Sequence, residues 1–132
     1  MSAPRPVPSN KGRRIVICDY NALLQSVTGL LRMSGYCVFQ AYDAMAAREL
    51  CGQLRNIEML ILNTTGTGVD SATLVRDIRE SHPALPVLHI GDCELDGMPS
   101  NVPTLAQSFT APQLLETVAR LMPAREIATP AA

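Results

Sequence analysis

The sequence predicts a three-layer α/β domain in which five parallel strands form a sheet with helices on both faces. Short apolar runs, several of them rich in β-branched residues, alternate along the chain with helical segments of roughly ten residues, as in βαβ units. The third apolar run, residues 59–62, is apolar at every position, which is typical of a parallel strand buried on both sides. Right-handed crossovers then place helices on both faces of the sheet.

The expected strands are short and each is followed by a helical pattern. After the first strand, leucine and valine recur at helical spacing, and Gly35 stands where a C-cap is needed. The expected strands are residues 14–18, 37–41, 59–62, 86–90 and 104–106. The expected N-caps are Asp43 for the second helix, Asp70 or Ser71 for the third, and Thr110 for the last.

A fourth helix is expected to be shortened or absent. Its segment contains Gly97, Pro99 and Pro103, and a proline inside a helix costs about 3 kcal/mol. The whole pattern predicts a flavodoxin-like doubly wound sandwich, in which ligands bind at the carboxyl ends of the strands. The residues at or just beyond those ends are Asp19, Tyr20, Asn63, Gly91 and Gln107.

Composition limits the class of protein. The chain has 132 residues, room for one domain, which we place at residues 13–122 between tails expected to be disordered at 1–12 and 123–132. The net charge of -1 gives no electrostatic signature for nucleic acid or an anionic membrane. There is no apolar run of transmembrane length and no secretory signal, so we expect a cytoplasmic protein that binds neither membrane nor nucleic acid.

The cysteine and histidine residues do not match a metal site. None of the cysteines forms a C-x-x-C pair, and we expect reduced thiols, with Cys18 and Cys37 acting as small apolar residues in their strands. His89 is expected to pack within the fourth strand, and His82 to face the last carbonyls of the third helix.

Several stretches of the chain resemble the CheY-like response-regulator receiver family over about residues 13–122. The most similar are R-R-I-V-I-C-D-Y-N, M-L-I-L-N-T-T-G-T-G-V-D-S, L-P-V-L-H-I-G and S-F-T-A-P-Q-L-L, in that order. In that family an acidic pair after the first strand helps to hold Mg²⁺, and an aspartate after the third accepts a phosphoryl group. The resemblance places Asp19 and Tyr20 on the acidic pair and Asn63 on the phosphoacceptor. It places Gly91 on the usual hydroxyl, Gln107 on the usual lysine and Thr104 on the aromatic switch position.

These differences from the family all remove charge or a reactive group. A neutral amide is a far weaker nucleophile than a carboxylate, and Mg²⁺ prefers carboxylate oxygens. We therefore expect no enzyme activity, no cofactor and weak or absent Mg²⁺ binding. Asn63 either mimics an active-like state or reflects lost function, and Tyr20 either fills the site with its ring or stays half-exposed.

The sequence thus predicts a stand-alone atypical receiver of two-component phosphorelay signalling that works through protein contacts without being phosphorylated. Expected partners are a histidine kinase, a phosphotransfer protein, another regulator or a second copy of the chain. The contact surface is expected along the first helix, with residues 23–31 partly exposed, or over residues 92–121. An alternative is a small-molecule or nucleotide-binding domain that uses the glycine-containing loop at residues 66–71. A weaker one is metal-dependent phosphoryl transfer through a residue such as Asp19.

Overall fold

The computed structural model describes residues 12–19, 25–63, 70–91, 97–106 and 108–122, and the expected tails, apart from Gly12, lie outside these ranges. Its strands are β1 (Arg14–Asp19), β2 (Cys37–Ala41), β3 (Ile57–Asn63), β4 (Val87–Ile90) and β5 (Thr104–Leu105). Its helices are α1 (Gln25–Met33), α2 (Ala44–Gln53), α3 (Ser71–Ser81) and α4 (Ala111–Leu121). The strands form one parallel sheet in the order β2-β1-β3-β4-β5, which confirms the predicted flavodoxin-like sandwich.

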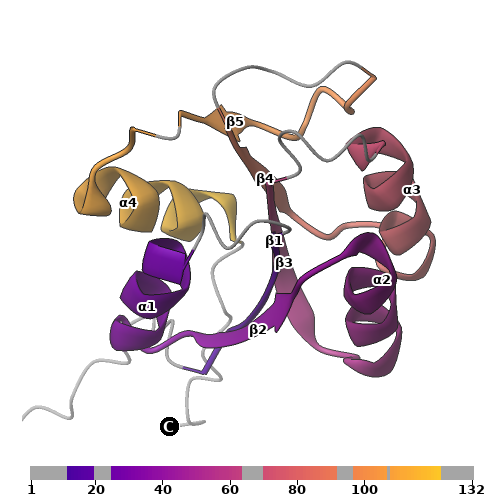
Figure 1. Cartoon of the computed structure of the whole chain (residues 1–132), viewed down its shortest axis with the longest axis horizontal. Helices are drawn as coiled ribbons and strands as arrows, with labels where there is room; N and C mark the ends of the chain where they lie inside the picture. Colours follow the sequence, from indigo (N-terminus) through magenta and orange to yellow (C-terminus); the bar gives the residue numbers. More distant parts are fainter. Residues whose placement is uncertain (1–11, 20–24, 64–69, 92–96, 107, 123–132) are drawn as a thin grey trace, which may run out of the picture.

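Two helices cover each face of the sheet: α1 and α4 lie on one side, and α2 and α3 on the other (Figure 1). The central strands β1 and β3 supply both cores, because successive side chains of a strand point to opposite faces. Ile15, Ile17 and Ile61 pack under α1 and α4, whereas Val16 and Leu60 pack under α2 and α3. Burying an aliphatic side chain of this size stabilises the fold by roughly 1.5–3 kcal/mol.

Capping residues fix where the helices begin and end. The Asp43 carboxylate accepts a hydrogen bond from the N–H of Ala46 at 2.7 Å, and Thr110 forms a capping box with Gln113. For α3 the cap is Asp70, whose carboxylate accepts from the N–H of Thr73 at 3.2 Å. Gly35 has φ +97° and ends the first helix in a left-handed conformation, a backbone angle that glycine adopts without steric cost.

The connection between β4 and β5 is held by an arginine of α3. The described residues 97–103 contain no helix, in agreement with the expectation that the helix between β4 and β5 is shortened or absent. Arg79 donates from Nε and Nη2 to the carbonyl of Leu85, at 3.2 and 3.0 Å, and from Nη1 to Oδ1 of Asn101 at 2.8 Å. Its guanidinium therefore ties the segment that precedes β4 and the segment that precedes β5 to α3.

Two local expectations were wrong. Cys37 is exposed, because β2 is an edge strand and its first residue faces solvent. His82 does not face its own helix: its Nε2 lies 2.6 Å from the carbonyl of Cys51, so that it links α3 to α2. The first helix is partly exposed over the described residues 25–31, since Gln25 and Gly29 are exposed whereas Leu31 is 0% exposed against the sheet.

The described residues contain no helix that is both long enough and apolar enough to cross a membrane.

The Arg79 contacts predict a specific loss of stability. Arg79→Ala should lower the free energy of unfolding by about 1–3 kcal/mol, because the carbonyl of Leu85 and the amide of Asn101 lose a charged donor. Urea denaturation measures this change. Arg76→Ala removes the same charge from an exposed position of α3 and should stay within about 0.5 kcal/mol of the wild type. Equal losses in the two variants would mean that Arg79 does not anchor the connection.

Candidate functional site

The structure places Asp19 beside Asn63. They are the last residues of β1 and β3 and are direct partners in the parallel register of these strands. Neighbouring strands lie roughly 5 Å apart, so the two residues lie side by side at the carboxyl-terminal ends of the strands. Asp19 is 1% exposed and Asn63 is 2% exposed, so both polar groups are buried in the fold. The pairing that the resemblance implied is therefore present as a buried carboxylate next to a neutral amide.

Gly91 and Thr104 lie near the same carboxyl-terminal ends of the strands. Gly91 follows β4 directly, and its N–H donates to the carbonyl of Leu105 at 3.1 Å. Having no side chain, Gly91 supplies no hydroxyl group to a ligand. Thr104 begins β5 and is half-buried. Tyr20 and Gln107 lie outside the described residues, so the predictions for them remain untested.

The electrostatics of this edge follow from the single carboxylate. A second carboxylate at position 63 would stand roughly 5 Å from Asp19 and would repel it by about 3 kcal/mol at an effective dielectric near 20. The amide of Asn63 avoids this repulsion while remaining polar. Over the ranges that the structure describes, no group of three or more His, Cys, Asp or Glu side chains is placed to hold a metal ion.

A buried histidine contacts Thr104, the residue that the resemblance places on the switch position. Nδ1 of His89 lies 3.1 Å from the hydroxyl of Thr104, its partner across the β4–β5 register. His89 is 1% exposed, and its Nε2 has no hydrogen-bond partner among the described residues. Burial lowers the pKa of His89 from its ordinary value of 6.5, so that the neutral ring is favoured. The sequence predicted a packed histidine here, but not its bond to Thr104, because only the register brings the two residues together.

The cysteine beside the site is not a reactive thiol. Cys18 is 0% exposed, and burial, together with the carboxylates of Asp43 and Asp19, raises its pKa to about 12. Burial also raises the pKa of Cys51 to about 11. Both thiols therefore stay protonated at neutral pH, where a reactive cysteine would need to be ionised.

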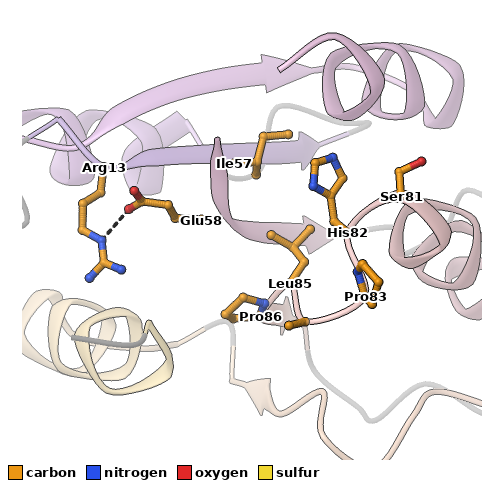
Figure 2. A pocket seen from close by; sticks show the side chains of 9 residues that line it. Arg13, Ile57, Glu58, Ser81, His82, Pro83, Leu85 and Pro86 are labelled. Atoms are coloured by element: carbon orange, nitrogen blue, oxygen red, sulfur yellow. Dashed lines mark hydrogen bonds and ion pairs between the residues drawn. The ribbon is translucent and has the colours of Figure 1, made fainter. Parts of the chain in front are cut away.

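A hollow of about 410 Å³ lies at the opposite, amino-terminal end of the sheet (Figure 2). Its walls include Ile57, Leu85 and Pro86, and at one side Nε of Arg13 contacts Oε2 of Glu58 at 2.5 Å. The side chain of Arg13 is only 6% exposed, so this ion pair is largely removed from water. The pair ties the start of β1 to β3 at the end of these strands that is farthest from Asp19 and Asn63.

Comparison by sequence gives one weak similarity to a signalling protein. No family model matches the chain. The chain is 23% identical over 115 residues to the sensor kinase CckA of Brucella abortus (strain 2308). That match covers 82% of this chain but only 12% of the kinase, so the chain corresponds to a small part of that protein's length.

Comparison by structure is much stronger. The receiver domain of the hybrid histidine kinase CckA superposes with a TM-score of 0.70 at 26% identity, over 85% of this chain and all of that one. The receiver domain of a sensor histidine kinase from Pseudomonas aeruginosa PAO1, which has a magnesium ion in its active-site cleft, gives 0.69 at 23% identity, over 83% and 97%. A response regulator receiver domain protein from Bacillus halodurans gives 0.72 at 16% identity, over 86% and 100%.

These neighbours share the fold of this chain over most of its length. The similarity to the receiver domain of CckA, at 26% identity, supports a role in two-component signalling. The resemblance seen in the sequence is confirmed at the level of the fold: the chain has the fold of the CheY-like response-regulator receiver domains.

Proposed function

We propose that this domain is an atypical receiver of two-component signalling that acts by protein–protein contact and is not phosphorylated. The observation that carries the proposal is the buried amide of Asn63 in register with the carboxylate of Asp19. A receiver that accepts a phosphoryl group needs a nucleophilic carboxylate at this point. The amide cannot form the acyl phosphate, so signalling would depend on shape and surface instead of on covalent modification.

The surroundings of Asn63 support the same proposal. Gly91 offers no hydroxyl, and in the pair of Asp19 and Asn63 only Asp19 carries a carboxylate. A phosphoryl group carries close to two negative charges and is stabilised by cations and by several donors. In this proposal the domain takes up neither a phosphoryl group nor Mg²⁺, and it has no catalytic role.

The state of Thr104 supports a domain that does not switch in the usual way. Nδ1 of the buried His89 ring lies within hydrogen-bond distance of its hydroxyl, and the two residues belong to the neighbouring short strands β4 and β5. A small side chain bonded to a neighbouring strand has no large inward and outward positions to exchange. The domain would therefore present one conformation of this edge to its partners.

The altered connection between β4 and β5 is the proposed contact region. Arg79 and Asn101 hold residues 97–103 against α3, and the described part of this connection supplies no helix next to β5. Leu105, Phe109 and Leu115 are partly buried there. We infer that a protein partner of the signalling pathway, such as a histidine kinase or a phosphotransfer protein, contacts this side.

The buried pair predicts the effect of restoring the acid. Asn63→Asp should lower the free energy of unfolding by roughly 1–3 kcal/mol at neutral pH without Mg²⁺, because two buried carboxylates then face each other. The deficit should shrink in acid, where one of them takes up a proton. Urea denaturation at two pH values measures both effects. The exposed Asn56 is a matched control, since Asn56→Asp should change stability by less than about 0.5 kcal/mol.

A small acyl phosphate tests the central proposal directly. After incubation with this donor and Mg²⁺, the intact mass of the wild type and of Asn63→Asp should not rise by the roughly 80 Da of a phosphoryl group. A variant that combines Tyr20→Asp, Asn63→Asp, Gly91→Thr and Gln107→Lys should gain it, provided that circular dichroism shows that it folds. Efficient labelling of the wild type, or of Asn63→Asp alone, would contradict the proposed loss of the whole site.

The buried histidine predicts a pH dependence of stability. The pKa of His89 lies below its ordinary value of 6.5 in the folded state, so the unfolded chain takes up a proton more readily. The contribution of His89 to the free energy of unfolding is therefore complete above pH 6.5. It falls as the pH drops from 6.5 towards the folded-state pKa. His89→Gln retains a partner for Thr104 but does not titrate, and should flatten this part of the curve. Thermal unfolding across the pH range measures the slope. An equal decline in His89→Gln would show that His89 is not its source.

A further inference from the structure

Strand β2 is an open edge of the sheet. Among the strands of the described residues it pairs with β1 alone, and it lies at the lower edge of the sheet in Figure 1. The N–H of Cys37 donates to the carbonyl of Arg13 at 2.8 Å, which sets the alternation of the strand. In a parallel ladder every second residue bonds to the same neighbour, so Val38 and Gln40 direct their N–H and C=O groups away from the sheet.

The residues of β2 themselves do not carry the usual protection against other strands. Natural edge strands are kept apart by charged side chains, proline, bulges or short length. β2 has five residues, C-V-F-Q-A, with no charge and no proline among them. The opposite edge differs, because β5 has two residues and follows Pro103 directly. The two edges of the sheet are therefore not equivalent, and β2 is the one that can accept a strand.

Large apolar side chains gather at the ends of this same strand. Met33 is 88% exposed, Tyr42 57% and Met45 69%, and these are the exposed large apolar side chains that the described ranges contain. Met33 ends α1 just before β2 begins, whereas Tyr42 and Met45 follow directly after β2 ends. Exposed apolar side chains thus flank both ends of this edge strand, where they are available to a second molecule.

One charged residue closes the edge. Nη2 of Arg32, in the last turn of α1, donates to the carbonyl of Val38 at 2.9 Å. This carbonyl is one of the groups that an added strand would need. The side chain of Gln40 is turned aside, since its Nε2 donates to the hydroxyl of Thr28 and its Oε1 accepts from the hydroxyl of Tyr42, both at 3.1 Å. The backbone at Gln40 is thus left uncovered by its own side chain.

We propose that the edge of β2 is a self-association surface for a second copy of this chain, and that Arg32 is the residue that closes it. An antiparallel pair centred on Phe39 would set Val38 of one copy opposite Gln40 of the other, so that each exchanges its outward N–H and C=O groups with the other. A twofold axis perpendicular to the sheet relates the copies in this arrangement, as in most symmetric dimers.

The apolar side chains favour a second copy over an unrelated strand. Antiparallel pairing brings the start of one β2 next to the end of the other. Met33 lies on the α1 side of the sheet, and Tyr42 lies on this side too, since it bonds to Gln40, which in turn bonds to Thr28 of α1. The twofold axis keeps the α1 sides together, so Met33 of each copy would meet Tyr42 of the other. It would also bring the two Arg32 guanidinium groups towards each other, and the repulsion between them would oppose pairing of the two β2 strands.

Sedimentation of the wild type and of Arg32→Ala at matched concentrations tests this inference, which does not depend on the proposed function. Arg32→Ala should associate to dimers with a dissociation constant at least about tenfold below that of the wild type. Arg32→Met keeps the aliphatic stem and its packing and should dimerise in the same way, which protects the test against a folding defect. Arg120→Ala removes an equal charge from α4 and should behave as the wild type.

Hydrogen exchange then locates the contact. In the dimer of Arg32→Ala, the amides of Val38 and Gln40 should become protected as the concentration rises. Adding Gln40→Pro should restore the monomer, because it removes an outward N–H that β1 does not use. The inference is overturned if both Arg32 variants remain as monomeric as the wild type, or if they dimerise without protection at Val38 and Gln40.

Discussion

The pairing of β1 with β3 is the constraint on which the rest of the structure depends. These neighbours run in register from Ile15 opposite Met59 to Asp19 opposite Asn63, with both faces of each strand covered. The register that builds the two cores also brings two polar side chains together at a buried edge. Whatever stands at positions 19 and 63 must therefore satisfy the packing of the fold as well as any chemistry.

This constraint explains how the fold can persist without the receiver chemistry, as the proposed function requires. In a working receiver, a metal ion and a phosphoryl group offset the repulsion between clustered carboxylates. Without that metal ion, a buried pair of acids would destabilise the sheet by about 3 kcal/mol, a large part of the 5–15 kcal/mol by which typical domains are stable. The amide of Asn63 removes the repulsion while preserving the shape of the strand end. In the proposed function, Asn63, Gly91 and the bonded Thr104 act together, so that the carboxyl-terminal ends of these strands have a structural role and no reactive one.

The sequence was sufficient for the fold because the relevant signals are local. Alternating apolar runs predicted the five strands, and the expected caps Asp43 and Thr110 are the ones observed. Register is not local, and this is where the sequence was insufficient. The bond between His89 and Thr104 joins residues of different strands, and the contact of His82 with the carbonyl of Cys51 joins different helices. Cys37 was misjudged for a related reason, since no local pattern distinguishes an edge strand from a central one.

The most direct test of the account is an amide NMR titration of the domain with Mg²⁺ and then with beryllofluoride, which imitates a bound phosphoryl group. If the buried amide of Asn63 has removed the receiver chemistry, the resonances of Asp19, Asn63 and Gly91 should not shift with either addition. Saturable shifts clustered at these residues would contradict the account, because they would show that this edge still binds a metal ion and a phosphoryl analogue.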